Sequence, residues 1–236
     1  MDDGLENKWK SFVQKHSDLA HGKIDQFLTD LEKDYKNKKI MEFQAAGADY
    51  STAVGKARQS WVAYVGGSLE TLIRFIVEPV AHEHGARIVK GKEIQNSKLN
   101  EEYDVVRRNL LIHFDKYSYL PDADLIVYRY EKEKGSKILV ILSVKNSFRE
   151  RYTETPYWKL KLDQSKITKP IKVFMVTPDR DDEISFDKRP SKARVILEYE
   201  LDGVYIAKNK GEFDSTNKIG NLSNLLDDLS KLLKKE

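Results

Sequence analysis

Two short stretches of the chain place acids and a lysine where strands are expected to begin and end. PDAD, Pro121 to Asp124, precedes the apolar segment LIVY, and SVK, Ser143 to Lys145, ends the apolar run ILVIL. A carboxylate can hold Mg²⁺, and an ammonium group beside it can orient or deprotonate a water molecule or stabilise a pentavalent phosphorus. These residue types together indicate hydrolysis of a phosphodiester.

The two stretches come together if the chain between them forms a β-hairpin. ADLIVYRY and ILVILSVK are joined by the polar, glycine-containing link EKEKGSK, which is typical of two strands and a turn. With the turn near residues 133–134, antiparallel pairing sets Asp124 opposite Ser143 to Lys145. Because side chains alternate with a period of two, Ser143 and Lys145 share a face, and so do Asp122 and Asp124. A structural Asp–Lys cross-strand pair would also fit these residues.

The segment that follows the second strand is basic and aromatic. From residue 143 to residue 172 there are eight basic and three acidic residues, an excess larger than the net charge of +3 of the whole chain. The interleaved aromatic residues are Phe148, Tyr152, Tyr157 and Trp158. A basic and aromatic patch beside a carboxylate suits a polyanion that also needs a cation.

Composition argues against several other kinds of chemistry. The 236 residues include no cysteine, which excludes disulfides, a cysteine nucleophile and a cysteine-based zinc site. No GxxxxGK[ST] or GxGxxG pattern supports nucleotide binding. His82 and His84 flank Glu83 without an evident third metal ligand, and we interpret them as surface residues. With 41 basic and 38 acidic residues, the overall charge does not by itself indicate nucleic acid.

The N-terminal sequence and the apolar runs bear on where the protein resides. MDDGLENKWK is acidic and polar, without the apolar core of a signal peptide. No run approaches the roughly 18 apolar residues of a membrane-spanning helix. We therefore expect a cytoplasmic protein with no membrane partner.

Periodicity divides the chain into helices followed by a sheet. Apolar residues recur at helical spacing over residues 24–35 and again over residues 51–77, where Pro79 is expected to end the helix. Extended segments begin at Tyr119 and include IKVFMVT and two strands within ARVILEYELDGVYIA. PYWKLKLDQSKI and the leucine-rich C-terminal segment are helical in pattern. We predict an α/β (α+β) fold with a central mixed sheet flanked by helices.

PDAD and SVK together resemble the signature of the PD-(D/E)XK nucleases, in which a proline–aspartate begins one strand and a (D/E)XK or SXK triplet ends the next. More narrowly, SVKNSFRER, residues 143–151, is similar to the SxK…R-(D/E)-R segment of type II restriction endonucleases that cut CCGG-containing sites. The resemblance covers roughly residues 66–162. It implies a restriction-endonuclease-like nuclease core over residues 51–236, preceded by a helical region, residues 1–50, that packs on it or forms a dimer interface.

The resemblance also implies roles for individual residues. Lys145 and Asp124 would be catalytic, with Asp124 a Mg²⁺ ligand and Asp122 the alternative ligand. Glu70 matches a glutamate that the family places near the metal, on a helix N-terminal to the sheet; its alternative interpretation is a solvated helix residue. Ser143 stands where the commonest form of the signature has a metal-binding acid. The predicted catalytic set is Glu70, Asp124, Ser143, Lys145 and Glu154.

In the CCGG group a glutamate on the following helix supplies the ligand that the serine cannot. Glu154 is our candidate because Glu150 is better suited to reading bases, although the spacing allows the reverse. The R-E-R residues would read G·C pairs, since arginine bonds guanine O6 and N7 while a carboxylate accepts from cytosine N4. The predicted metal ligands are Asp124, Glu154 and Glu70. The predicted DNA-contacting residues are Asn146, Ser147, Arg149, Glu150, Arg151, Lys159 and Lys161.

The resemblance thus implies a Mg²⁺-dependent type II restriction endonuclease that hydrolyses double-stranded DNA at a short, palindromic site containing C·G pairs. A palindrome presents two equivalent strands, so a two-fold homodimer would place one active site on each. A cognate DNA methyltransferase is implied, because an unprotected host genome would be cut. The site, the cut position and the choice between dimer and tetramer stay open. The alternatives are a structure-selective or repair nuclease and a non-catalytic DNA-binding regulator.

Overall fold

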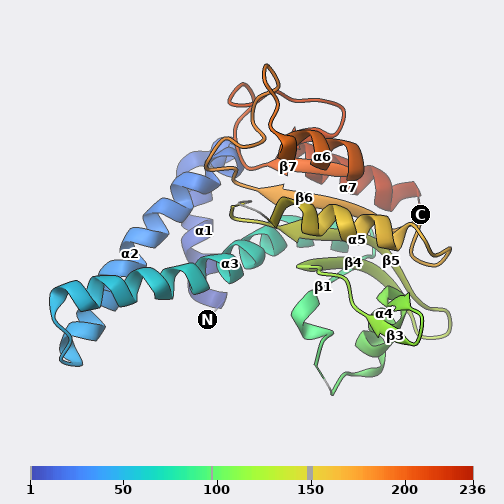
Figure 1. Cartoon of the computed structure of the whole chain (residues 1–236), viewed down its shortest axis with the longest axis horizontal. Helices are drawn as coiled ribbons and strands as arrows, with labels where there is room; N and C mark the ends of the chain where they lie inside the picture. Colours follow the sequence, from blue (N-terminus) through green and yellow to red (C-terminus); the bar gives the residue numbers. More distant parts are fainter. Residues whose placement is uncertain (1, 97, 148–150, 236) are drawn as a thin grey trace.

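The computed structural model describes residues 2–96, 98–147 and 151–235 (Figure 1). Helices come first, and a mixed sheet with helices on both faces follows. The helical elements are α1 (Asp2–His16), η1 (Ser17–Lys23), α2 (Ile24–Ala45), α3 (Tyr50–Glu83), η2 (Gly91–Glu93), α4 (Glu101–Leu110), η3 (Arg151–Thr153), α5 (Glu154–Leu162), α6 (Lys192–Glu200) and α7 (Leu222–Lys235). The strands are β1 (Arg87–Lys90), β2 (Ile112–Phe114), β3 (Tyr117–Tyr119), β4 (Leu125–Glu131), β5 (Gly135–Val144), β6 (Lys172–Thr177), β7 (Gly203–Ile206) and β8 (Ile219–Asn221).

The main sheet has the strand order β1-β4-β5-β6-β7-β8. The pairs β1–β4 and β4–β5 are antiparallel, whereas β5–β6, β6–β7 and β7–β8 are parallel. Parallel neighbours need crossover connections, and α5 and α6 lie in the connections that follow β5 and β6. The predicted central mixed sheet flanked by helices is confirmed.

The predicted hairpin forms in the predicted register. Leu125 pairs with Leu142 and Glu131 with Gly135, which centres the turn on residue 133. The register shifts by one within the hairpin, so β5 contains an extra residue at Leu139, as in a β-bulge. Because the pairing at the open end is kept, the residue before β4 lies opposite the end of β5.

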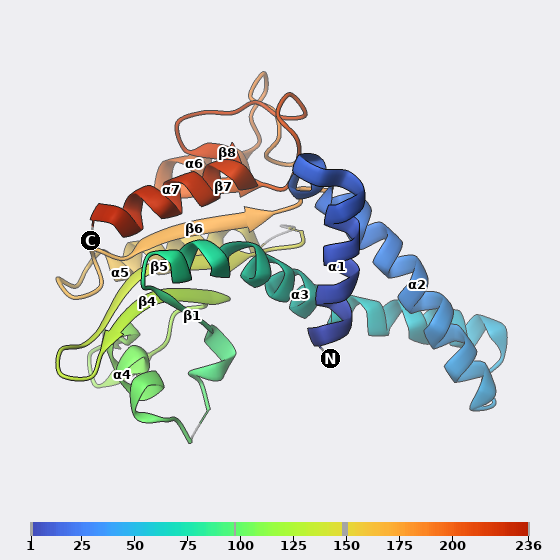
Figure 2. The same ribbon diagram turned by 180° about the vertical axis from the view of Figure 1, so that it is seen from behind.

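The sheet separates two hydrophobic clusters. Residues of α1, α2, α3 and α7 pack with Leu125 and Val140 on one face. Residues of α4, α5 and α6 pack with Ile126 and Ile141 on the other. Figure 1 shows α5 lying over one face, and Figure 2, from behind, shows α3 and α7 over the opposite face. The alternating apolar residues of β4 and β5 therefore serve both clusters, which fixes the register of the hairpin.

The apolar stripe of residues 24–35 is used inside the chain. Ile24, Phe27, Leu28 and Leu31 are buried in the same cluster as the sheet residues, and Tyr35 stacks on Tyr64 of α3. Figure 1 shows α2 and the first half of α3 projecting from the sheet as a helical pair. The stripe thus packs the N-terminal helices onto the core. A dimer interface over residues 1–50 stays a prediction and would use other surfaces of these helices.

The prediction that Pro79 ends the second long helix is wrong. Pro79 lies inside α3, which continues to Glu83. A proline removes one backbone hydrogen bond from the helix, and the packing of the buried Val77 and Ala81 on either side compensates for this loss. Gly85, with a φ of 69°, follows the end of the helix, as is typical of a glycine there.

The prediction of two strands in ARVILEYELDGVYIA is also partly wrong, because residues 192–200 form α6. Ser191 caps this helix by accepting a hydrogen bond from the backbone N–H of Arg194. Ala193 and Leu197 are buried four residues apart, whereas Tyr199 is 80% exposed. This burial has helical periodicity, and only the second predicted strand, β7, forms. Within the described residues no helix is long and apolar enough to cross a membrane.

Candidate active site

The open end of the β4–β5 hairpin brings an acid and a lysine together, as predicted. Asp124 precedes β4 directly and lies opposite Ser143. Its Oδ2 atom accepts a hydrogen bond from the backbone N–H of Val144 at 2.6 Å and lies 3.5 Å from Lys145 Nζ. The same ammonium group donates to Asp122 Oδ2 at 3.0 Å. The backbone of the strand therefore holds Asp124, while Lys145 lies between two carboxylates.

Burial and charge act in opposite directions on these groups. The side chains of Lys145 and Asp124 are 10% and 15% exposed, whereas that of Asp122 is 48% exposed. Burial raises the pKa of Asp124, and the nearby lysine and the N–H of Val144 only partly oppose this. Burial lowers the pKa of Lys145, but Asp124 and Asp122, with Glu154, outweigh burial and raise it. Lys145 is therefore held as a cation.

Glu70, on α3, lies near the same open end of the β4–β5 hairpin. Its side chain is 22% exposed and lies 4.0 Å from Lys92 Nζ. Burial raises its pKa, and so does the negative charge of Asp124, while Lys92, Lys90 and Lys145 oppose the shift. Glu70 and Asp124 are thus near enough to repel each other. The structure brings the predicted helix glutamate to the predicted strand-end acid.

Glu154 lies near the same end of the hairpin, on the opposite face of the sheet. It is the first residue of α5 and raises the pKa of Lys145. Ser143, only 1% exposed, hydrogen-bonds Thr155 of the same helix, with 2.9 Å between the two hydroxyl oxygens. The serine hydroxyl therefore links strand to helix. Glu150 lies outside the described residues, so the choice between Glu150 and Glu154 stays open.

The predicted base-reading residues fall largely in the part of the chain that is not described. Arg149 and Glu150 lie outside the described residues. The backbone of Arg151 opens η3, but its side chain is also outside them. Asn146 and Ser147 follow Lys145 directly and are half-buried. Among described side chains, the Oδ1 atom of Asn146 is buried without a hydrogen-bond partner.

Lys159 does not join this group. It is 7% exposed, and its ammonium group lies 3.0 Å from both Asp163 and Asp202. Asp202 also accepts a hydrogen bond from the backbone N–H of Val173, at the start of β6, whereas Lys145 bonds the end of that strand. Lys159 therefore lies at the other end of the sheet, and two carboxylates already neutralise it. The structure places it in an interior ion pair, at the opposite end of the sheet from Lys145.

Lys161 lies on the side of α5 that faces the small β2–β3 hairpin. Its Nζ atom is 5.4 Å from the ring centroid of Phe114 and 5.6 Å from that of Tyr157. Both are cation–π distances, and Tyr157 is 45% exposed. Lys161 and its aromatic neighbours thus form a partly open surface next to α5.

The donor chemistry of the site fits Mg²⁺. In the described part of the chain no three His, Asp or Glu side chains gather as a ready-made metal site, so Asp124, Glu70 and Glu154 are not assembled as a closed set. Mg²⁺, however, binds oxygen ligands and commonly uses one or two carboxylates together with water and substrate phosphates. Glu70 and Asp124 each have a pKa raised by burial and by a neighbouring carboxylate. A divalent cation beside these carboxylates would offset both the cost of burying their charge and the repulsion from the neighbouring carboxylate, and it would lower both pKa values.

The sequence analysis missed the turn that flanks this site. RIVK forms β1, and Lys90 and Lys92 lie beside Glu70. The N–H of Gly91 donates to the carbonyl oxygen of Asp124 at 3.0 Å. A Cβ atom at Gly91 would lie 1.8 Å from the carbonyl oxygen of Ala123, so only glycine fits here. The short apolar run followed by glycine was the available signal.

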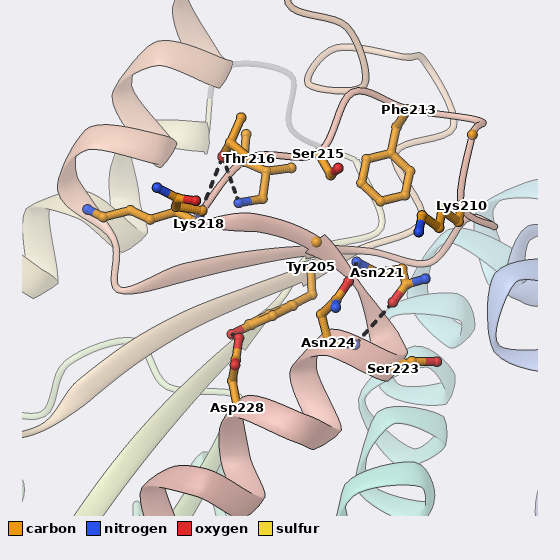
Figure 3. Close-up of a pocket in the computed structure, with 14 residues that line it drawn as sticks. Tyr205, Lys210, Phe213, Ser215, Thr216, Lys218, Asn221, Ser223, Asn224 and Asp228 are labelled. Carbon is orange, nitrogen blue, oxygen red and sulfur yellow. Dashed lines mark hydrogen bonds between the residues drawn. The ribbon is translucent and has the colours of Figure 1, made fainter.

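A separate cavity of about 440 Å³ lies between β7, β8 and α7. None of the predicted site residues that the structure describes lines it. Figure 3 shows Tyr205 pointing toward Asp228 and Asn221 paired with Asn224. Tyr205 donates to Asp228 at 3.1 Å, and Asn221 Oδ1 accepts from the N–H of Asn224 at 3.1 Å. These polar groups satisfy one another, and the cavity is not the candidate active site.

Comparison with known proteins defines the class. A family model described as BsaWI restriction endonuclease type 2 matches residues 96–228. The chain belongs to this family of type II restriction endonucleases, and it is accordingly a site-specific endonuclease.

Two relatives match most of the chain. MjaVIP of Methanocaldococcus jannaschii, named as a type II restriction enzyme, is 41% identical over 90% of this chain and 94% of its own length. HpyAORF263P of Helicobacter pylori, also named as a type II restriction enzyme, is 40% identical over 80% of this chain and 95% of its own length. Among solved structures, restriction endonuclease PspGI in complex with substrate DNA is similar in fold, with a TM-score of 0.59, 13% identity, and coverage of 98% of this chain and 93% of PspGI. The match confirms the restriction-endonuclease fold.

Proposed function

We propose that this type II restriction endonuclease uses Mg²⁺ to cut double-stranded DNA at a short palindromic site that contains C·G pairs. The observation that carries the proposal is the position of Lys145, between Asp122 and Asp124 at the open end of the hairpin. Glu70 and Glu154 lie near the same end of the hairpin, on opposite faces of the sheet. The arrangement combines oxygen ligands for a cation with a fixed ammonium group, as hydrolysis of a phosphodiester requires.

Each residue then has a defined task. Asp124, Glu70 and Glu154 would hold the ion, and Asp124 is preferred to Asp122 because it is buried and fixed by the N–H of Val144. When bound, Mg²⁺ would neutralise charge on the phosphoryl oxygens and make a bound water more acidic. Lys145, as a cation, would stabilise the negative charge that develops around phosphorus and orient the attacking water.

Base recognition is assigned to the chain that follows Lys145. Arg149 and Arg151 would bond guanine, and Glu150 would accept from cytosine N4. Asn146 and Ser147 follow Lys145 directly, so they would lie in the same DNA-contacting segment. A two-fold homodimer would place one such segment on each half of a palindrome. The proposal includes a cognate methyltransferase that protects the host genome.

The test is incubation of the purified protein with unmethylated plasmid and phage DNA, with Mg²⁺ or EDTA, followed by gel electrophoresis. We expect discrete fragments that require the metal. Lys145→Ala should abolish cutting while specific binding is kept. Lys134→Ala is the matched control, because Lys134 is a lysine of the same hairpin, 78% exposed, at its closed end. Diffuse degradation or cutting of branched DNA alone would contradict the restriction function, as would binding without cleavage under any metal.

A further inference from the structure

The two glutamates that helices bring to the site share a feature: each is followed by a buried threonine. Thr71 follows Glu70 and is 4% exposed, and Thr155 follows Glu154 and is 3% exposed. Successive residues of a helix are about 100° apart around its axis. A buried threonine therefore leaves the preceding glutamate at the side of the helix, next to its buried face.

On α5, the threonine is bonded to the strand that carries the lysine. Thr155 and Ser143 form a hydrogen bond of 2.9 Å between hydroxyl groups, and both residues are buried. Ser143 lies two residues before Lys145, on the same face of β5. This bond fixes the first turn of α5, where Glu154 lies, against the end of β5.

On α3, Thr71 is hydrogen-bonded to a residue of β1, the strand that pairs with β4 on the side away from β5. Lys90 Nζ donates to Thr71 Oγ1 at 2.7 Å, and Thr71 Oγ1 donates in turn to the carbonyl oxygen of Gly67 at 2.8 Å. Lys90 is itself buried, and it pairs with Leu125, the residue that follows Asp124. The turn of α3 that carries Glu70 is thereby tied to β1, beside the strand-end acid.

We infer that Thr71 and Thr155 are positioning residues, which fix the helix turns that carry Glu70 and Glu154 on opposite faces of the sheet, at the open end of the hairpin. The inference rests on the proposed function. It also gives Ser143 a new role: its hydroxyl group would hold Thr155, where the commonest signature has a metal ligand. A helix end that shifts by a fraction of an ångström would move its carboxylate away from the ion, since Mg²⁺ demands near-ideal geometry.

The variants Thr71→Val and Thr155→Val remove the hydroxyl groups and keep the shape of the side chains. Cleavage would be measured in single turnover at saturating DNA over a range of Mg²⁺ concentrations. Binding of Mn²⁺ to the protein–DNA complex would be followed by electron paramagnetic resonance, and DNA affinity in EDTA and the melting temperature would be recorded. We expect each variant to lose about tenfold in cleavage rate or metal affinity, as is common when a residue that orients a ligand is removed. DNA affinity in EDTA should be unchanged.

Two further sets of variants separate positioning from stability. Thr71→Ser and Thr155→Ser keep the hydroxyl group and should restore metal binding and cleavage. Thr168→Val is the matched control, because Thr168 is 2% exposed and donates to the carbonyl oxygen of Leu162 at 2.6 Å, at the far end of α5. It should lower the melting temperature without changing metal binding.

A double-mutant cycle tests the Ser143–Thr155 bond from both sides. Ser143→Ala breaks the same bond, so it replaces Thr155→Val if that variant melts below the assay temperature. The double variant should be no worse than either single variant. Three outcomes would overturn the inference while the wild type still cuts. The losses of cleavage rate in the double variant could be additive, both valine variants could bind metal like the wild type, or Thr168→Val could lose as much metal affinity as they do. A wild type that neither binds Mn²⁺ nor cuts would overturn the proposed function, and the inference with it.

Discussion

Lys145 Nζ lies 3.0 Å from Oδ2 of Asp122, a carboxylate that is half exposed to solvent. The lysine is therefore closer to Asp122 than to Asp124, at 3.5 Å, although Asp124 is the more buried of the two and is fixed by a backbone N–H. An exposed ion pair contributes little to the free energy of unfolding. Removing the charge of a buried, fixed carboxylate has a larger effect, because the groups around it lose their partner. The two aspartates of PDAD are thus expected to differ in their importance for cleavage.

Replacing each aspartate with asparagine tests this difference. Asp124→Asn should lower the cleavage rate by at least about a hundredfold, because it removes a preorganised charge from the site. Asp122→Asn should lower it by less than about tenfold, since it breaks only a half-exposed pair. Single-turnover cleavage with saturating Mg²⁺ measures both variants. The opposite order of effects would make Asp122 the metal ligand.

The predicted base contacts are tested by specificity. Arg149→Ala should reduce discrimination between the recognition site and a site with one changed base pair by about 1–3 kcal/mol for each lost contact. Competition binding in EDTA with both duplexes gives this number. Lys161→Ala, in contrast, should weaken binding to both duplexes equally, as expected of a contact to phosphate. A uniform loss in Arg149→Ala would exclude it from base reading.

Lys159 and Lys161 lie two residues apart on one helix and should differ in stability. Lys159→Met removes the ammonium group that Asp163 and Asp202 share, and it should lower the free energy of unfolding by about 1–3 kcal/mol. Lys161→Met should change it by less than about 1 kcal/mol, since Lys161 is half-buried and loses only its cation–π contacts with Phe114 and Tyr157. Urea unfolding measures both. Equal stabilities would show that the Lys159 pairs contribute nothing.

The same ion-pair group predicts a dependence of stability on pH. Burial acts to raise the pKa of Asp202, but hydrogen bonds from Lys172, Val173 and Lys159 prevail, so its pKa is lowered in the folded state. A lowered pKa stabilises the fold above the pKa of the unfolded chain, about 4, and this stabilisation disappears as the pH falls below that value. The difference in unfolding free energy between wild type and Asp202→Asn should therefore be full at pH 7 and shrink below about pH 4. A difference that is constant over this range would contradict the charged pair.

The hairpin could be predicted from the sequence because two apolar runs are joined by a short, polar link that contains glycine. The turn sets the pairing at the closed end of the hairpin, and the bulge at Leu139, which the sequence does not reveal, brings Asp124 opposite Ser143. Glu70 could be placed through the family resemblance, since spacing along the chain does not say which strand a helix residue meets. The part of the site that depends on local sequence pattern could therefore be predicted from the sequence.

Other features depend on partners far along the chain. Residues 192–200 are rich in β-branched and aromatic residues, yet burial of every fourth residue makes them a helix. Lys159 appeared to belong to a basic patch, because its partner Asp202 lies far along the chain, in the connection between α6 and β7. Nothing in RIVKGK shows that this segment borders Asp124. These contacts arise from tertiary packing, which propensity does not record.

The backbone N–H of Lys145 donates to the carbonyl oxygen of Val176, in the strand that follows α5. During synthesis the ribosome makes Glu70, Asp124, Lys145 and Glu154 before it makes that strand. A nascent chain can therefore carry the whole predicted catalytic set while the lysine still lacks the neighbour that fixes it. The catalytic end of the hairpin is therefore complete only after β6 has been made and has paired with β5.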